Sequence, residues 1–330
     1  MYKLNSSNKK LKHSESNEII MRQTLVVYYS QSGQLKQIID SFLIPFRDIE
    51  IEYLVVDPKY PFPFPWDGKS FFDVIPESVL EEAIEINTPK FKHNKYDLIL
   101  FAYQPWFLSP SLPATAILKN TEFGKKLKDT PIITILGARN MWLNGQESVK
   151  QIIREKGGRL VGNIPLIDRN FNLISVITIV HWLGTGKKTK KWGIFPLPGV
   201  AEKEINESYM FGEKAFRALM NNHFGDLQKE ILSLNKIKIN TSLLFIESRA
   251  KKLFLIWAKF IKKKGTNARK RESLLSFFRI YLYLALFLIS PIVLTIYTLL
   301  IRPLTQKQIK RKKDYFLNIT HNENIESIYN

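Results

Sequence analysis

The chain alternates short apolar runs with amphipathic segments. Short runs rich in β-branched, aliphatic and aromatic residues predict parallel strands, because strands buried on both faces are mostly hydrophobic. Five such runs are residues 24–29, 49–56, 97–102, 131–137 and 159–167. Between them, apolar residues recur at helical spacing in 34–45, 77–86, 112–120 and 145–156. This alternation predicts an α/β fold with a doubly wound, five-stranded parallel sheet.

The first predicted strand runs into a polar loop and then a helix. The residues concerned are Ser30, Gln31, Ser32, Gly33, Gln34 and Leu35. A strand, a hydroxyl-rich loop and a helix in that order direct several backbone N–H groups at one point and add the helix dipole. We therefore expect an anion cradle here, with the phosphate of a mononucleotide as its occupant. A plain strand–helix turn is the alternative.

Two further loops follow the third and fourth predicted strands. They contain Tyr103, Gln104, Pro105 and Trp106 in one case, and Ala138, Arg139, Asn140, Met141 and Trp142 in the other. Ligands of doubly wound sheets bind beyond the carboxyl ends of the strands. A flavin ring needs aromatic surface and backbone hydrogen bonds. Although each tryptophan alone is more often a core residue, three loops at one edge favour FMN.

Arg139 is the candidate for a chemical role in the third loop. A guanidinium there would stabilise an anionic enolate or hold a phosphate. A surface arginine or an internal ion pair is the competing interpretation. The spacing of Asp67, Asp168 and His181 pairs none of them as acid and base, so the sequence assigns no catalytic base.

Residues 57–76 interrupt the strand–helix rhythm with prolines and aromatic residues. They form either a surface crossover or a wall over the binding cleft. After residue 170 the sheet pattern fades. Residues 201–224 look like a long amphipathic helix, and 228–249 like another.

The C-terminal region differs in kind. Residues 280–301 contain no charge and lie between Arg279 and Arg302. About 20 such residues cross a bilayer as a helix. Because Pro291 lies near the middle and both flanks are basic, a single span and a re-entrant hairpin are both open. A buried core helix is a third interpretation.

Charge and composition limit the kinds of binding partner to be expected. Of the net charge of +19, most lies in residues 251–313, which hold sixteen Lys or Arg and the single acid Glu272. Beside an apolar segment, these bases favour anionic lipid over nucleic acid, for which no motif is present. The polar N-terminus has no apolar signal region, so we expect the cytoplasmic face of the inner membrane.

The absence of cysteine excludes disulfides, thiolate catalysis and thiolate metal sites. Five scattered histidines lack the spacing of metal ligands, so we expect no metal.

The phosphate loop resembles that of flavodoxins and flavodoxin-like quinone reductases, over residues 22–170. Flavodoxins commonly end this loop in threonine, whereas Leu35 stands here. A closer resemblance, over most of 22–225, is to the bacterial dialkylresorcinol condensing enzymes of flexirubin and aryl-polyene pigment biosynthesis. The matching segments are 28–35, 64–66, 71–80, 101–114, 137–142, 161–164, 168–170 and 193–196.

Composition, hydropathy and these resemblances together predict the following organisation. A disordered polar segment (1–21) precedes a flavodoxin-like domain (22–170) and a family-specific extension (171–225). Basic amphipathic helices (226–273), the transmembrane or re-entrant segment (274–302) and a basic tail (303–330) follow, and 226–330 lie outside the match.

The resemblance also implies a partner ketosynthase, possibly with its acyl carrier protein, and a lipid-soluble dialkyl substrate. Joining two β-ketoacyl chains normally needs a thiol, which this chain lacks. We therefore expect the partner to condense the chains, and this protein to oxidise a dialkyl cyclohexanedione to a dialkylresorcinol with FMN. An NAD(P)H:quinone or flavin reductase, and a non-catalytic scaffold that recruits the ketosynthase, are the alternatives.

Overall fold

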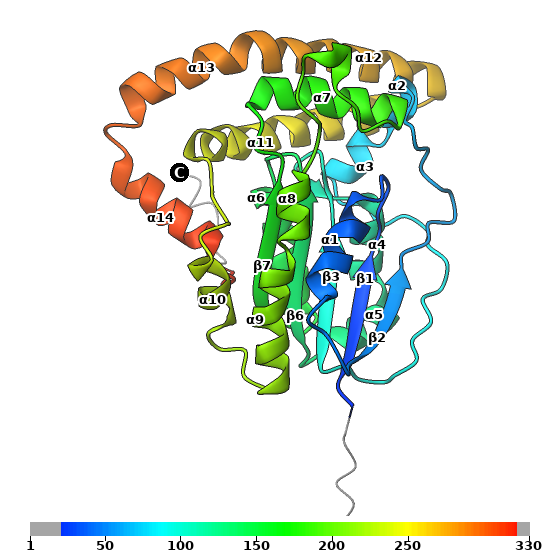
Figure 1. Ribbon diagram of the computed structural model, residues 1–330. Coiled ribbons are helices and arrows are strands. Elements are labelled where there is room, and N and C mark those ends of the chain that lie inside the picture. Colours follow the sequence, from blue (N-terminus) through cyan, green and yellow to red (C-terminus); the bar gives the residue numbers. More distant parts are fainter. Residues whose placement is uncertain (1–20, 322–330) are drawn as a thin grey trace, which may run out of the picture.

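A five-stranded parallel sheet forms the centre of the molecule (Figure 1). The computed structural model describes residues 21–321, so the expected disordered segment (except residue 21) and residues 322–330 of the tail lie outside the described residues. The strands are β1 (Gln23–Tyr28), β2 (Glu50–Val55), β3 (Leu98–Tyr103), β6 (Pro131–Ala138) and β7 (Arg159–Ile167). Their spatial order is β2-β1-β3-β6-β7. This is the flavodoxin-like order, and it confirms the predicted fold class.

Helices cover both faces of the sheet, as the alternating pattern predicts. One hydrophobic core lies between the sheet and α1 (Gln34–Leu43), α8 (Glu202–Asn206), α9 (Tyr209–Met220) and α10 (Leu227–Ser233). The other lies under α4 (Leu112–Lys119), α5 (Thr121–Leu127) and α6 (Leu143–Glu155). All six residues of β3 are buried. Central strands are thus apolar on both sides, which explains their uninterrupted hydrophobic runs.

Three predicted helices differ from the structure. The helix predicted over 77–86 is wrong: α3 (Ile75–Val79) ends early, Glu81 has a φ of 55°, and Ile86 is extended in a bridge to Pro58. The long helix predicted over 201–224 is divided into α8 and α9. The helix predicted over 228–249 is divided into α10 and the start of α11 (Thr241–Lys264), because Asn235 at a φ of 56° interrupts it.

The C-terminal helices cross the upper end of the sheet, where its strands finish (Figure 1). With α7 (Asn172–Thr185) and α11 lies a continuous helix made of α12 (Ala268–Leu284), η2 (Ala285–Ile289), α13 (Ser290–Ile296) and η3 (Tyr297–Ile301). By length and composition this helix could cross a membrane, and only 6% of its most apolar stretch is buried. We call it the roof helix. The chain then turns back to the sheet through α14 (Gln306–Leu317).

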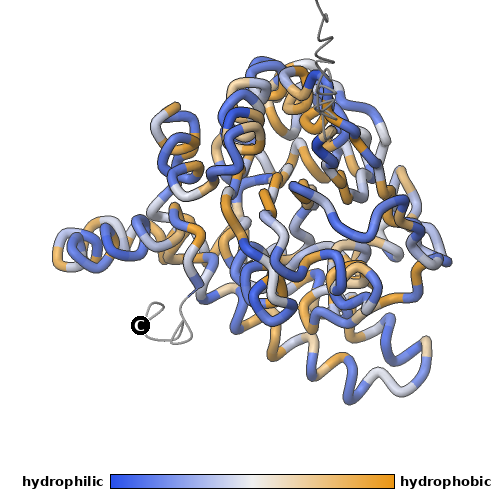
Figure 2. Tube along the Cα trace, turned by 90° about the horizontal axis from the view of Figure 1, so that it is seen from below, coloured by the Kyte–Doolittle hydropathy of each residue, from blue (hydrophilic) through white to orange (hydrophobic). Residues whose placement is uncertain are grey.

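The short elements complete the connections. α2 (Gly68–Asp73) precedes α3, β4 (Pro105–Trp106) pairs with β5 (Ser109–Pro110), and η1 (Lys191–Gly193) lies between α7 and α8. The turns at the lower end of the sheet are mostly hydrophilic (Figure 2). The two ends of the molecule therefore differ in surface character.

Gly212 allows α9 to approach α1 closely. A Cβ atom at this position would lie 1.8 Å from the carbonyl oxygen of Phe42, so one helix would have to move. We expect Gly212→Ala to lower the free energy of unfolding by about 3 kcal/mol or more, as overpacking does against backbone. Gly225→Ala is the control, because its new Cβ meets only the His223 ring at 3.5 Å. Denaturant unfolding that shows equal stabilities for the two variants would contradict this account.

Candidate functional site

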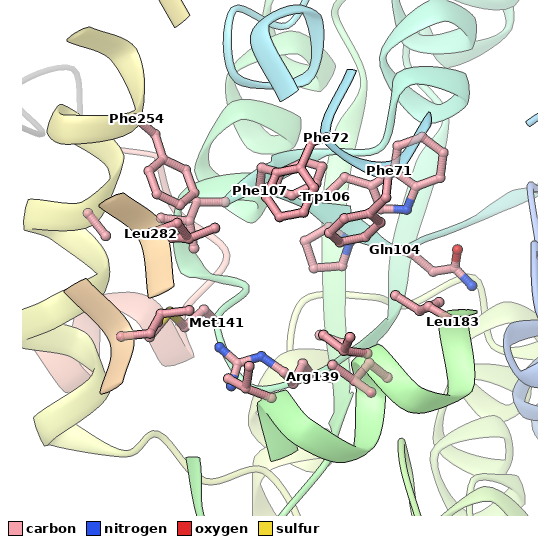
Figure 3. A pocket seen from close by; sticks show the side chains of 18 of the residues that line it. Phe71, Phe72, Gln104, Trp106, Phe107, Arg139, Met141, Leu183, Phe254 and Leu282 are labelled. Carbon is pink, nitrogen blue, oxygen red and sulfur yellow. The ribbon is translucent and has the colours of Figure 1, made fainter. Parts of the chain in front are cut away.

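A cavity of about 670 Å³ lies at the carboxyl end of the sheet, between the strands and the roof helix (Figure 3). Its volume lies within the usual range of roughly 300–1,000 Å³ for small-molecule and cofactor sites. The three loops identified from the sequence all reach it. The predicted residues that line it are Gln31, Ser32, Gln34, Leu35, Gln104, Pro105, Trp106, Ala138, Arg139 and Met141. Ser30, Gly33, Tyr103, Asn140 and Trp142 do not.

The first loop ends at the N-terminus of α1. Gly33 is the N-cap residue at a φ of 81°, and among residues 21–321 no side chain caps the helix. The hydroxyl of Ser30 is buried without a hydrogen-bond partner among those same residues. The first-turn N–H groups and this hydroxyl are the kind of donors that bind an anion.

Gln34 contributes to this loop only through its backbone. Its side-chain amide donates to the carbonyl oxygen of Val200 at 3.2 Å and accepts from the Val200 N–H at 3.0 Å. The amide thus ties the start of α1 to the segment before α8.

The second loop is a small hairpin of β4 and β5. Its two turn residues, Phe107 and Leu108, have φ values of 49° and 65°, as in a type I′ turn, and both line the cavity. Trp106 packs edge-to-face against Trp66, with ring centroids 5.7 Å apart. Tyr103 is fully buried, and its hydroxyl donates to Gln146 at 2.9 Å, so it is a core residue.

In the third loop, three residues before Trp142 face the cavity, whereas Trp142 does not. Ala138, Arg139 and Met141 face the cavity, and the Asn140 amide donates to the Asn172 side chain at 2.9 Å. Trp142 is only 3% exposed and packs in the core beneath α6. The expectation that Trp142 faces the ligand is wrong, because it is the N-cap residue of α6 and its side chain follows that helix into the core.

The proline-rich segment supplies the aromatic surface instead. Phe71 and Phe72 line the cavity beside Trp106 (Figure 3). Trp66 also lines it. Phe71 contacts Phe107 with ring centroids 5.2 Å apart. The side chain of Asp67 caps α2 by accepting from the N–H groups of Lys69 and Ser70. The segment is therefore a wall of the cavity, which was one of its two interpretations.

Arg139 is held with its guanidinium at the cavity. One nitrogen, Nη1, donates to the side-chain oxygen of Asn172 at 2.7 Å and to its carbonyl oxygen at 3.2 Å. Burial lowers the pKa of Arg139 to about 10, against the opposing charges of Asp168 and Glu247. The side chain is therefore cationic at neutral pH, and it can attract a negative charge that forms in the cavity.

Glu247 on α11 is a buried acid that sequence reasoning missed. Its carboxylate accepts from the N–H of Asn144 at 2.8 Å, at the start of α6, and from the Asn144 side chain at 3.2 Å. Burial raises the pKa of Glu247 to about 7, although these hydrogen bonds and Lys251 oppose the shift. Its only sequence signal is that it is the single acid in α11.

The remaining walls of the cavity come from the C-terminal half of the chain and are mostly apolar, with Arg249 and Ser290 as polar exceptions. They include Val176 and Leu183 of α7, Phe254 of α11, and Leu282, Leu286 and Val293 of the roof helix. The sequence predicted a membrane role for the last of these segments and no role in the cavity.

Neither a protein-family model nor a curated protein matches the chain. Several solved structures do. A flavoprotein from Lactobacillus acidophilus, crystallised with FMN, is 19% identical, with 44% of this chain and 93% of that chain covered at a TM-score of 0.35. A flavoprotein from Bacteroides eggerthii is 16% identical, with 44% of this chain and 87% of that chain covered. A flavoprotein from Bacteroides uniformis is 13% identical, with 49% of this chain and 98% of that chain covered. The two Bacteroides structures each have a TM-score of 0.35.

The buried Glu247 predicts a specific pH dependence. Because its pKa rises from 4.5 to about 7 on folding, the folded chain holds a proton in this window that the unfolded chain has lost. Stability from this group is thus complete below pH 4.5 and is lost as the pH rises through 7, by at most about 3 kcal/mol. Glu247→Gln should remove this part of the dependence. Denaturant unfolding of both proteins at about pH 5 and about pH 8 measures it; parallel profiles would refute it.

Proposed function

We propose that this protein binds FMN in the cavity and oxidises a lipid-soluble dialkyl cyclohexanedione to a dialkylresorcinol. The observation that carries the proposal is the meeting of three features in one apolar cavity. These are the uncapped N-terminus of α1, the aromatic wall at Trp66 and Trp106, and the cationic Arg139. One of the structures similar in fold was crystallised with FMN, which is consistent with this choice.

The donors of the first loop fit a phosphate. Ser32 faces the cavity, the Ser30 hydroxyl has no partner among the described residues, and Gly33 places the α1 N–H groups without a side chain in the way. Dianionic phosphate is stabilised by such N–H groups and by the helix dipole. Leu35 removes one hydroxyl that flavodoxins commonly offer, so the phosphate would depend more on the backbone.

The aromatic wall fits a flat ring. Trp66 and Trp106 meet nearly perpendicularly, at 80°, so one indole presents its face where the other presents its edge. FMN, when bound, supplies a two-electron acceptor for a hydride.

The chain's own groups account for substrate binding. Conversion of a cyclohexane-1,3-dione ring to a resorcinol removes two hydrogens, one as a proton and one as a hydride. The proton is acidic because the anion it leaves is an enolate, and Arg139 would stabilise that charge. The apolar walls at Leu183, Phe254 and Leu282 would bind the alkyl chains and exclude water.

The proposal includes a partner for the earlier step. Because the chain has no cysteine, a ketosynthase would form the ring by joining two acyl chains. A quinone is the class of acceptor that would reoxidise the cofactor in a membrane. The resemblance to the dialkylresorcinol condensing enzymes supports a ketosynthase as the partner. In this proposal the chain itself carries out only the oxidation step.

A single anaerobic experiment tests the function. Purified protein loaded with FMN is mixed with a synthetic dialkyl cyclohexane-1,3-dione, and flavin absorbance and the resorcinol product are followed. Bleaching of the flavin with one resorcinol formed per flavin supports the proposal. Bleaching by NADPH alone would instead indicate a quinone or flavin reductase. Failure to take up FMN at all would indicate a scaffold.

A negative charge introduced at position 32 should weaken FMN binding. Ser32→Glu places a carboxylate beside the cradle and should weaken FMN binding at least tenfold, since like charges near a protein surface repel by roughly a few kcal/mol. Ser32→Gln has similar bulk without charge and is the matched control. Titration of FMN by fluorescence quenching measures both, and equal affinities would place the phosphate elsewhere.

Arg139 should affect catalysis more than cofactor binding. Arg139→Gln removes the cation and should lower kcat for dione oxidation by roughly 10²-fold, the usual scale for one oxyanion-stabilising group. Arg169→Gln is the control, because Arg169 pairs with Glu204 and does not line the cavity. Single-turnover rates that are equal in the two variants would exclude Arg139 from the reaction.

A further inference from the structure

The roof helix has two apolar faces, and one of them is directed towards the protein. Its inner face lines the cavity. Its outer face is exposed: Phe277 by 63%, Leu284 by 51%, Leu288 by 58% and Leu299 by 68%. No charged residue lies between Arg279 and Arg302. Exposed apolar surface of this extent marks a protein or membrane interaction site.

The N-terminal end of the roof helix is held on the flavodoxin-like domain. Arg271 Nε pairs with Asp73 Oδ1 at 2.6 Å, and Arg271 Nη2 pairs with Glu77 Oε2 at 2.8 Å. Phe278 is fully buried in a cluster with Ile75 of α3 and Ile261 of α11. This end therefore packs against α2 and α3.

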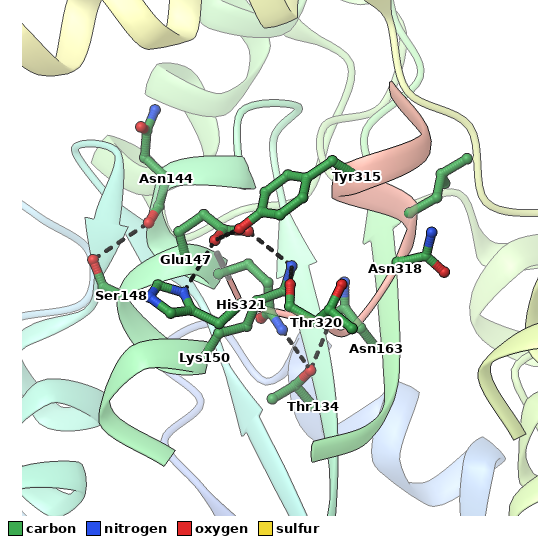
Figure 4. Close-up of polar contacts among 12 residues, drawn as sticks. Thr134, Asn144, Glu147, Ser148, Lys150, Asn163, Tyr315, Asn318, Thr320 and His321 are labelled. Carbon is green, nitrogen blue, oxygen red and sulfur yellow. Dashed lines mark hydrogen bonds and ion pairs between the residues drawn. The ribbon is translucent and has the colours of Figure 1, made fainter. Parts of the chain in front are cut away.

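The C-terminal end is held on the same domain through α14 (Figure 4). Phe316 is 1% exposed, and the hydroxyl of Tyr315 donates to Glu147 Oε2 on α6 at 2.7 Å. Glu147 also pairs with Lys150 at 2.8 Å and with His321 at 3.5 Å. Both ends of the roof helix are thus fixed to one body.

These two attachments are incompatible with a single span. A spanning helix puts its ends on opposite sides of a hydrocarbon layer about 30 Å thick. Either α12 would have to leave α3, or α14 would have to leave α6. A helix that is held at both ends on one body, with one apolar face outward, can instead lie in the plane of the membrane interface.

The charges around this face identify its partner. Sixteen bases in residues 251–313 flank the apolar surface. The segment between α7 and α8 lies at the same upper end (Figure 1). In this segment Lys191 lies over the ring of Trp192, which is 75% exposed, and Ile194 is 80% exposed. Lysines beside exposed aromatic and aliphatic side chains match a surface of anionic phospholipid. The lower end, with its hydrophilic turns, would face water (Figure 2).

We propose that the protein docks on an anionic bilayer as a monotopic protein, with the outer face of the roof helix at the boundary of headgroups and acyl chains. The cavity then lies directly beneath this helix, so that a lipid-soluble molecule enters it from the bilayer without crossing water. Only the identity of that molecule rests on the proposed function. The docking itself is independent of it.

Binding to vesicles gives the first test, with protein that carries no FMN. Vesicles of phosphatidylcholine mixed equally with phosphatidylglycerol should bind the chain in flotation more tightly than phosphatidylcholine alone, and less tightly at high salt. Leu284→Glu with Leu288→Glu should weaken binding at least tenfold. Met220→Glu, at an exposed residue of α9, should leave it unchanged. Equal binding by all three proteins would overturn the proposal. It would also be overturned if the double variant bound vesicles normally and its only effect were to dissociate a dimer of the chain.

The topology is tested with single cysteines, which are unique because the chain has none. Lys270→Cys and Lys307→Cys place one thiol at each end of the roof helix. In inverted membrane vesicles from expressing cells, a membrane-impermeant maleimide should label both to the same extent. Labelling of only one would establish a single span and refute monotopic docking.

The orientation is tested inside the helix itself. A fluorophore on Leu288→Cys, on the outer face, should be quenched by phospholipids that carry a nitroxide on the acyl chain. The same fluorophore on Leu286→Cys, which lines the cavity, should be quenched several-fold less. Equal quenching would mean that lipid surrounds the helix, as in a re-entrant hairpin, and would overturn the proposal. Since no step needs flavin, these outcomes are separate from those that test FMN chemistry.

Discussion

The parallel alignment of the five strands is the constraint on which the site depends. Tyr28 pairs with Val55 on one side and with Ala102 on the other, and Ala102 pairs with Ile135. Because all strands point the same way, the loops that follow β1, β3 and β6 meet at one edge. Each loop brings a different group to that edge: helix N–H donors, an aromatic hairpin and a guanidinium.

An edge that collects such groups must be covered if they are to act without competition from water. Here the C-terminal third of the chain provides the cover. α11 and the roof helix pack on α2 and α3, and Arg271 bridges two acids of those helices. Desolvation strengthens electrostatic interactions inside, which is why the charge of Arg139 matters more here than on a surface. The apolar tail is thus part of the cavity as well as an outer surface.

Two buried carboxylates connect this cover to the sheet, and both do so through α6. Glu247 of α11 accepts from the first turn of α6, whereas Glu147 of α6 accepts from Tyr315 of α14. Buried charge is costly unless it is paired and hydrogen-bonded. Glu147 has Lys150 as its cation, while Glu247 depends mainly on amide donors, so that burial raises the pKa of Glu247 towards neutrality. Protonation of Glu247 is therefore linked to the packing of α11 against α6.

Local periodicity was enough to predict the strands, the sheet class, the loop after β1 and the apolar character of residues 280–301. Trp106 and Trp142 show where local pattern fails. Each lies in a loop that follows a predicted strand, and only tertiary packing decides that Trp106 lines the cavity whereas Trp142 joins the core beneath α6. Hydrophobicity likewise made residues 280–301 look like a membrane segment. Their attachment depends on contacts such as Arg271 with Asp73, between residues that are 198 positions apart. Contacts at that distance leave no periodic trace in a single sequence, so only the tertiary structure could reveal them.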